Sequence, residues 1–363
     1  MAPLRVPLSR SSSSRSSSSR SASSRSSSFR SSSFRPSRAS LLFGLVLAAC
    51  SGSDSTTKAP TAPPTPTPTP TAPPSPTGPQ GALAVGQTYT DKGAYVEYVV
   101  GDAPLVLVAP HGGTLTPAAL PDRTCSACVT VADANTQELT RAVADTFFAR
   151  TGKRPHLVIN RLHRRKFDAN RDVTEATGGN RGLDTTWLWM HAAIDSARLR
   201  VTRLGARGLL LDMHGHGHAV PRLELGYLLT AATLRQDNAS LVASGAMTRT
   251  SIAQLSLDSR SIADRGVALL RGPNSLGALL VARGVPAVPS PADPAPLVGE
   301  EYFNGGYNTE RHGSLNGAAL DAIQIEHHFS GVRDNATTRG VYARALVEAL
   351  LAYLARHYGW PGA

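Results

Sequence analysis

The chain has 363 residues and a formal net charge of +11. Residues 1–38 are almost entirely serine and arginine and carry eight of these charges, so only +3 is left for the rest of the chain. Such a low-complexity tract buries too little apolar surface to fold, and we expect a disordered leader. The charge does not indicate nucleic-acid binding, because no interleaved aromatic residues and no reader motif accompany it.

Residues 39–50, ASLLFGLVLAAC, form a short apolar stretch that ends in small residues. A basic tract followed by such a stretch is typical of a secretory signal, and the stretch is short for a permanent membrane span. Its ending, LAAC, resembles the lipobox of bacterial lipoproteins, which implies a lipid anchor at Cys50. We therefore expect a lipid-anchored protein of the bacterial cell envelope that faces the periplasm or the exterior. A cysteine that merely follows an ordinary signal is the alternative.

Residues 51–81 are rich in proline and threonine, a composition that favours an extended, semi-rigid linker. Residues 82–363 are long enough for one domain with a substantial core. The hydrophobic patterns predict strands at 95–101, 104–109, 156–161, 208–214, 223–229 and 319–329, and helices at 133–152, 185–204 and 338–357. The prediction is an α/β fold with a mixed, largely parallel sheet and helices on both faces. We expect two modest helices in 241–286 and a mobile, aromatic-rich loop at 296–314.

Cys125 and Cys128 lie in TCSAC, within an irregular stretch at 114–132. Exported proteins fold where disulfides persist, so we expect a local bridge between these two cysteines. Two cysteines do not suffice for a zinc knuckle. The length of the stretch is typical of a functional, lid-like loop.

Two histidines, His111 and His214, stand at the ends of apolar runs that predict core strands. Open α/β sheets bind ligands beyond the carboxyl ends of their strands, and a hydrolytic zinc site uses three protein ligands and leaves one position open. This pattern predicts a Zn²⁺ site, whose third ligand is Asp133 or Glu138. Both acids also suit the start of a helix for structural reasons alone. His216 and His218 follow in a glycine-rich turn and either line the pocket or have no role.

Further charged residues favour a polar pocket near this site. Cations crowd around Asp168 and the pair Asn170 and Arg171, which predicts either a carboxylate-binding pocket or a solvated loop with local ion pairs. Glu326 lies in an apolar strand, where a carboxylate is either a general base or part of a buried ion pair.

Six motifs in this order resemble the N-formylglutamate amidohydrolase family across residues 104–335. They are PHGG, the acid before TQEL, DANRD, DMHGHG, FNGGYNTERHGS and IQIEHHF. The resemblance implies a fold like that of zinc carboxypeptidases and poly-γ-glutamate hydrolases. It implies zinc held by His111, Asp133 and His214, with Glu326 as the general base.

The same resemblance implies that Asn170 and Arg171 bind a substrate carboxylate and that Arg164 polarises the scissile carbonyl. It also implies a substrate-binding loop tyrosine, which is Tyr307 or else Tyr302. The expected function is zinc-dependent hydrolysis of an amide bond in a small molecule or peptide with a free carboxylate, such as an N-acyl or N-formyl amino acid. One alternative is a cell-surface, carboxypeptidase-like peptidase acting on peptidoglycan stem peptides or γ-glutamyl polymers. A second is a non-catalytic binding module on the same fold.

Overall fold

The computed structural model describes residues 78–125, 128–204 and 207–361. The expected leader, the signal with Cys50 and nearly all of the linker lie outside the described residues. Among the described helices, none is both long and apolar enough to cross a membrane.

The described residues form one eight-stranded sheet in the order β1-β2-β4-β3-β5-β8-β6-β7. The strands are β1 (Thr88–Thr90), β2 (Val96–Val99), β3 (Leu105–Ala109), β4 (His156–Asn160), β5 (Gly208–Gly215), β6 (Leu223–Gly226), β7 (Ala287–Val288) and β8 (Leu320–His327). The four central strands β4, β3, β5 and β8 are parallel to one another. Antiparallel pairs join β2 to β4 and β6 to β8. The predicted mixed, largely parallel sheet is confirmed.

The central strands are buried on both faces, which explains why their sequences are almost continuously apolar. Along β3, Leu105 and Leu107 belong to one hydrophobic cluster, while Val106 and Val108 belong to another on the opposite face. Successive strand side chains point to opposite faces, so an unbroken apolar run serves both layers.

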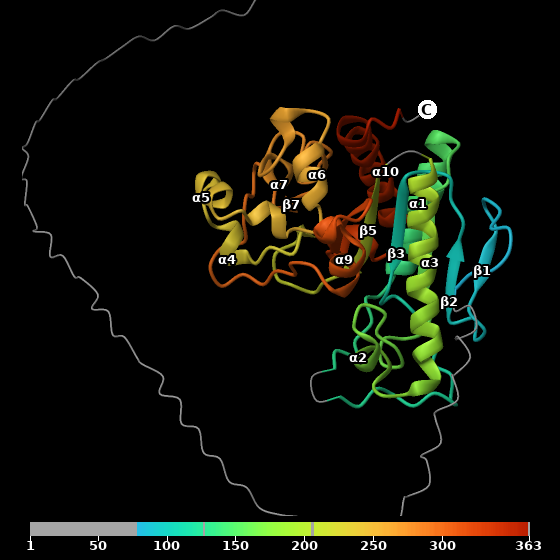
Figure 1. The fold of residues 1–363 in the computed structure, drawn as a ribbon. Helices are drawn as coiled ribbons and strands as arrows, with labels where there is room; N and C mark the ends of the chain where they lie inside the picture. The colour runs from blue at the N-terminus through green and yellow to red at the C-terminus, as the bar shows by residue number, and fades with distance from the viewer. Residues whose placement is uncertain (1–77, 126–127, 205–206, 362–363) are drawn as a thin grey trace, which may run out of the picture. The chain divides into compact units, whose positions relative to one another are not determined.

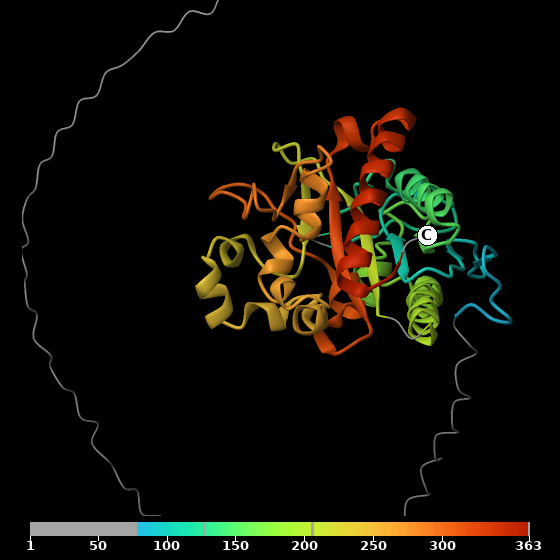
Figure 2. The same ribbon diagram turned by 90° about the horizontal axis from the view of Figure 1, so that it is seen from above.

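Helices cover both faces of the sheet (Figures 1 and 2). The longer ones are α1 (Thr136–Thr151), α3 (Asp184–Arg203) and α10 (Ala336–Tyr353). The shorter ones are α2 (Val173–Thr177), α4 (Ala231–Leu234), α5 (Asn238–Ala243), α6 (Ala253–Asp258), α7 (Ala268–Arg271), α8 (Leu276–Val281) and α9 (Tyr307–His312). Buried residues of α1 and α10 share one hydrophobic cluster, and those of α3 belong to the other. The helices therefore form an outer layer on each side, as predicted.

Two local predictions are wrong. The segment expected to form two helices instead holds the short helices α5 to α8, because glycines such as Gly245, Gly266 and Gly272 interrupt it. Gly245 and Gly266 both adopt positive φ values, which end a right-handed helix. The aromatic-rich loop contains α9, which begins at Tyr307.

Candidate metal centre

The carboxyl ends of β3 and β5, neighbours in the sheet (Figure 1), bring His111 and His214 together. His111 lies in the turn after β3, and His214 is the last residue but one of β5. Asp133 precedes α1, and its backbone N–H donates to the carbonyl of His111 at 3.1 Å. This backbone bond brings the acid next to the first histidine, although a long irregular segment separates them in the sequence.

The side chains of His111, Asp133 and His214 converge on one point. Asp133 Oδ2 lies 3.4 Å from His111 Nδ1 and 3.3 Å from His214 Nδ1. Tetrahedral ligands at about 2.0–2.1 Å from zinc are themselves separated by about 3.3–3.4 Å. The spacing of these atoms therefore matches a zinc site.

The far nitrogens of both histidines are held by buried carboxylates. His111 Nε2 donates to Asp168 Oδ1 at 2.6 Å, and His214 Nε2 donates to Asp212 Oδ2 at 2.9 Å. Because a carboxylate only accepts, the ring proton sits on Nε2 and the Nδ1 lone pair is left free. His111 Nδ1 is buried without a hydrogen-bond partner among the described residues. Carboxylates behind histidines orient and strengthen them as metal ligands, so the donor set fits a divalent metal.

Asp133, and not Glu138, is the acid of this cluster. Glu138 is exposed in the first turn of α1, whereas Asp133 is buried. The backbone N–H of Gly215 donates to Asp133 Oδ2 at 3.1 Å. Burial acts to raise the pKa of Asp133, but His111 and His214 outweigh it and hold that pKa below its usual range. The carboxylate is therefore ionised and available as a ligand.

Glu326 lies beside His214 in the β5–β8 register. Its Oε1 accepts from Gln324 Nε2 at 2.8 Å, while its Oε2 is buried without a partner among the described residues. Burial raises the pKa of the Glu326 carboxyl to about 8, and His214 acts in the opposite direction. A carboxyl with a pKa near neutrality both accepts and returns a proton readily, which suits general acid/base catalysis.

These residues line a cavity of about 110 Å³, together with Arg164, Asn170, Arg171, Phe303 and Gly305. The Nε of Arg164 donates to Asp168 Oδ2 at 3.0 Å, and its Nη1 lies 3.5 Å from Asp133 Oδ1. The side chain of Arg171 is partly exposed, and its Nε donates to Glu175 Oε1 at 2.9 Å. The pocket thus combines the predicted metal ligands, the predicted base and two guanidinium groups.

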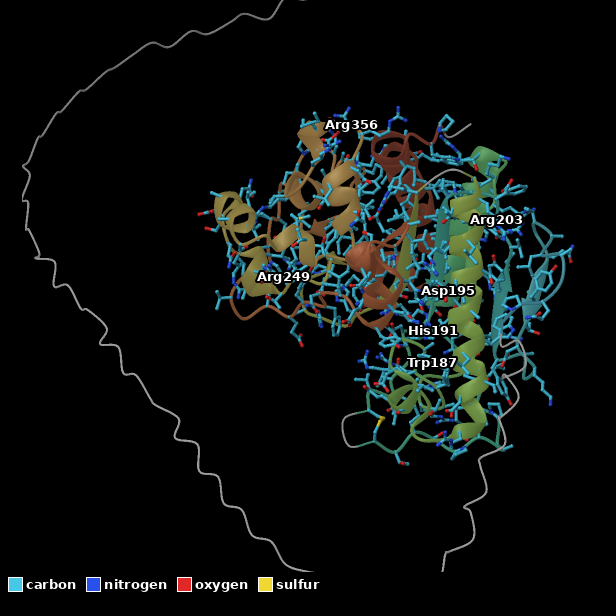
Figure 3. All side chains as sticks on the ribbon, in the orientation of Figure 1. Trp187, His191, Asp195, Arg203, Arg249 and Arg356 are labelled. Carbon is cyan, nitrogen blue, oxygen red and sulfur yellow. A yellow bond between two sulfur atoms is a disulfide. The ribbon has the colours of Figure 1, made fainter. Side chains whose placement is uncertain are left out.

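Tyr307 is not among the residues that line this cavity. Its ring packs against Trp187 and His191 of α3, two residues labelled in Figure 3, and its hydroxyl accepts from Arg311. Tyr302 is also engaged elsewhere, because its hydroxyl donates to the carbonyl of Leu225 at 2.6 Å. The aromatic residue of this loop that lines the pocket is Phe303.

A disulfide joins Cys125 and Cys128, as predicted. The guanidinium of the neighbouring Arg123 is buried and donates to the carbonyl of Val129 at 2.5 Å. The same group lies 3.4 Å from Asp168 Oδ2. Arg123 therefore ties the cysteine loop to the carboxylate that orients His111.

Asp168, Asp212 and Gln324 support the site, although none of them was predicted to contact a metal ligand or the general base. A signal for two of them was present. Asp212 and Gln324 each stand two residues before a functional side chain on the same strand, and residues at this spacing share a face of the sheet.

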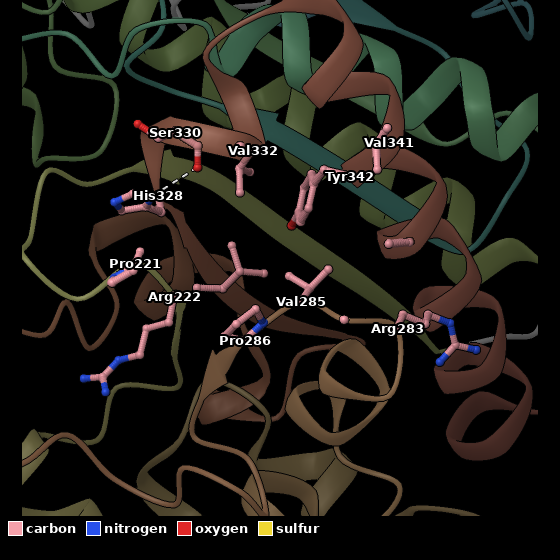
Figure 4. A pocket seen from close by; sticks show the side chains of 14 residues that line it. Pro221, Arg222, Arg283, Val285, Pro286, His328, Ser330, Val332, Val341 and Tyr342 are labelled. Carbon is pink, nitrogen blue, oxygen red and sulfur yellow. Dashed lines mark hydrogen bonds between the residues drawn. The ribbon is translucent and has the colours of Figure 1, made fainter.

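A larger cavity, of about 290 Å³, lies between the segment before β7 and α10 (Figure 4). It is lined mainly by apolar groups such as Val285, Pro286 and Val341. None of its described lining residues is acidic, so it offers no carboxylate to a metal ion. The smaller pocket is therefore the candidate site.

The described chain is thus an α/β protein with a candidate His/Asp/His metal centre. No protein-family model and no curated protein matches it. A gene product of Agrobacterium tumefaciens is similar in structure, with 16% identity, a TM-score of 0.42, and coverage of 72% of this chain and 95% of the other.

Two further solved structures are also similar. N-formylglutamate amidohydrolase from Ralstonia eutropha has 14% identity, a TM-score of 0.43, and coverage of 71% of this chain and 95% of the other. A metallo-carboxypeptidase from Pseudomonas aeruginosa has 13% identity, a TM-score of 0.31, and coverage of 72% and 60%. Likeness this distant carries no conclusion about activity, which has to come from the site itself.

Proposed function

We propose that this protein is a zinc-dependent hydrolase that cleaves an amide bond in a substrate with a free carboxylate. One observation carries the proposal. The Nδ1 atoms of two histidines each lie 3.3–3.4 Å from the same carboxylate oxygen. A buried glutamate stands beside them, and one of its oxygens has no partner among the described residues. A binding module has no need of an unpartnered buried carboxylate next to a metal site, because such a group costs stability.

His111, Asp133 and His214 would hold the zinc. The chemistry that zinc supplies when bound is Lewis acidity, which acidifies water and polarises a carbonyl oxygen. Glu326 Oε2 is the unpartnered oxygen, and it takes a proton from the attacking water and passes that proton to the leaving amine. Arg164 lies beside Asp133 on the pocket wall, where it faces a scissile carbonyl.

Arg171 and Asn170 select the substrate in this proposal. Both line the cavity, and a guanidinium binds a carboxylate through two parallel hydrogen bonds. The cavity of about 110 Å³ favours a small acyl group, such as the formyl group of an N-formyl amino acid, over a bulky chain. The alternative is a carboxypeptidase-like activity on stem peptides or γ-glutamyl polymers. A comparison of N-acyl amino acids with γ-glutamyl peptides as substrates tests it.

We also propose that a lipid anchor determines where the protein is located. The lipobox-like LAAC supports a lipid anchor at Cys50 and a place in the bacterial cell envelope. The anchor would hold the catalytic domain at the membrane surface, where exported peptides and amino-acid derivatives are accessible.

The test compares zinc content and amidase activity of the full-length protein with those of Glu326→Gln and His214→Ala. Glutamine keeps the shape of Glu326 but cannot take up the proton, so we expect tightly bound zinc to remain and kcat to fall by about 10²- to 10⁴-fold. His214→Ala removes a ligand and is expected to lose both the tight zinc and the activity. The substrates are N-formyl and N-acetyl amino acids, the matched amides without the carboxylate, and γ-glutamyl peptides.

His163→Ala is the matched control, because this histidine lies outside the metal cluster and its Nδ1 accepts only from a neighbouring backbone N–H. It is expected to keep zinc and activity. A native protein that binds zinc but cleaves none of these amides would contradict the enzymatic proposal and favour a binding module. Equal rates on substrates with and without the carboxylate would contradict the role given to Arg171.

A further inference from the structure

A second group of potential metal ligands lies beside the candidate centre and consists of His216, His218 and Glu224, the second cluster. One ligand atom from each residue lies within 4.8 Å of the others. His216 and His218 follow the end of β5, and Glu224 is on β6. Glu224 pairs directly with Glu326 across the antiparallel β6–β8 register, which places the second cluster next to the candidate general base.

His216 presents a lone pair to this cluster. Its Nε2 lies 2.8 Å from the carbonyl oxygen of Arg222, which only accepts, so Nε2 carries the proton. Its Nδ1 is therefore unprotonated, accepts from the backbone N–H of His218 at 3.2 Å and lies 4.0 Å from Glu224 Oε1. An ion at this nitrogen would replace that single hydrogen bond. An imidazole whose far nitrogen is fixed by a carbonyl is oriented as metal-ligating histidines usually are.

Glu224 is a buried carboxylate that has no lysine or arginine partner among the described residues. Its side chain is 1% exposed, and its Oε2 accepts from the backbone N–H of Phe303 at 2.8 Å. Its ion-pair partners among the described residues are only His216 and His218, and no lysine or arginine nitrogen is within 4.0 Å. Two carboxyl groups directly opposite each other on adjacent strands disfavour each other's ionisation, and Glu224 faces Glu326 in this way. A cation beside Glu224 would offset both effects.

The second cluster also has access to solvent. The His218 side chain is 12% exposed, and its Nε2 lies 4.0 Å from Oε1 of Glu301, which is largely exposed. The ring of Phe303, which lines the catalytic pocket, packs against the His218 ring with centroids 4.6 Å apart. Phe303 therefore contacts both the pocket and the second cluster, and the partly exposed His218 is the part of the cluster that meets solvent.

We propose that His216, His218 and Glu224 bind a second divalent transition-metal ion next to the catalytic centre. Imidazole and carboxylate ligands suit Zn²⁺ among the common divalent ions. The proposal does not depend on the hydrolase activity. Glu224 Oε1 lies 2.7 Å from His218 Nδ1 and 4.0 Å from His216 Nδ1, a less even spacing than in the first centre. Side chains must move to surround an ion, so the second ion binds more weakly than the first.

The experiment is a titration of the full-length apoprotein with Zn²⁺ in competition with a chromophoric chelator, with unfolding temperatures as a check on folding. The native protein is expected to bind two equivalents, one tightly and one more weakly. His218→Ala and Glu224→Gln are expected to lose the weak equivalent and keep the tight one. His214→Ala is expected to do the opposite, so a failure of the first centre is distinguishable from a failure of the second.

His163→Ala controls for zinc binding by histidines in general and is expected to keep both equivalents. The competing explanation is an ion pair between a protonated His218 and Glu224, with no metal. In that case the native protein binds a single equivalent, or His218→Ala binds as many as the native protein, and either result overturns the proposal. Anomalous diffraction at the zinc edge from zinc-soaked native crystals gives a check without any variant, because a peak between His216 and Glu224 is expected.

Discussion

The two ends of the parallel strands use buried histidines in opposite ways. At the carboxyl end, the Nδ1 atoms of His111 and His214 face Asp133, and carboxylates hold their Nε2 atoms. At the amino end, His156 begins β4 and is equally buried. Its Nδ1 lies 2.9 Å from the hydroxyl of Tyr98 and accepts from the backbone N–H of Gly101 at 3.0 Å.

This contrast shows that burial at a strand end does not make a histidine a metal ligand. At His156 the lone pair of Nδ1 is already used by donors, and its other nitrogen has no partner among the described residues. At the carboxyl end a carboxylate accepts a hydrogen bond from the Nε2–H of each proposed ligand, so the proton stays on Nε2 and the lone pair on Nδ1 is free. The partner of the Nε2 atom therefore distinguishes His156, which has none among the described residues, from the two proposed metal ligands, whose Nε2 atoms face carboxylates.

Among the variants that test this contrast, Asp168→Asn is expected to have the largest effect. Asparagine removes the negative charge behind His111 and no longer fixes its proton on Nε2, so we expect the affinity for the tightly bound Zn²⁺ to fall about 10- to 100-fold. The measurement is a competition titration of the folded apoprotein with Zn²⁺ and a chelator.

Asp321→Asn is the matched control, because Asp321 is also fully buried but lies near the amino end of β8. Its carboxylate pairs with Arg207 at 3.1 Å, so this variant is expected to lose stability and to keep its zinc affinity. If the two variants lose zinc affinity equally, the contrast between the two ends is wrong.

The sequence predicted the sheet and the places of the two histidines because both depend on local patterns. Apolar runs such as LVLVA and GLLLDM are buried on both faces, and each run ends beside a histidine. The turn after β3 and the parallel register then place His111, His214 and Glu326 together at the carboxyl ends of the central strands. The hydrophobic patterns left Asp133 and Glu138 open, and the family resemblance favoured Asp133. The structure adds the physical reason, a backbone bond from Asp133 to the carbonyl of His111.

Other parts of the site were not accessible from the sequence, because they depend on contacts between distant segments. Asp168 is 57 positions from His111, and its role appears only where their side chains meet at 2.6 Å. Tyr307 was predicted to bind substrate, but it lies outside the residues that line the pocket, since α9 packs its ring against Trp187. A glycine-rich loop does not reveal in its sequence which of its aromatic residues lines the pocket, and here it is the partly exposed Phe303.

The second-largest expected effect is the pH dependence of the free energy of unfolding that His156 causes. Burial lowers the pKa of His156 to about 3, from about 6.5 in an unfolded chain. Below pH 6.5 the unfolded state binds the proton and the folded state does not, so stability is full above pH 6.5 and is lost as pH falls toward 3. The slope approaches about 1.4 kcal/mol per pH unit, or about 2 kcal/mol lost by pH 5.

His156→Asn tests this, because asparagine places an acceptor oxygen near the position of Nδ1 and does not titrate. We expect the free energy of unfolding of the variant, measured by urea denaturation of the apoprotein at pH 7, 6 and 5, to fall less steeply than that of the native protein. The other histidines titrate in both proteins and cancel in the difference. Identical slopes would mean that His156 is not the buried neutral group that its contacts indicate.

The smallest expected effect is that of Tyr98→Phe, which removes the hydroxyl that contacts His156 and leaves the ring in the core. Gly101 still donates to His156 Nδ1, so the imidazole keeps one partner, and we expect a loss of about 0.5–1.5 kcal/mol in the free energy of unfolding. Zinc affinity should not change, because this contact lies at the end of the strands opposite to the metal ligands. A measurable fall in zinc affinity would show that the two ends are energetically coupled through the strands, and the histidines at the two ends would then have to be treated as one network.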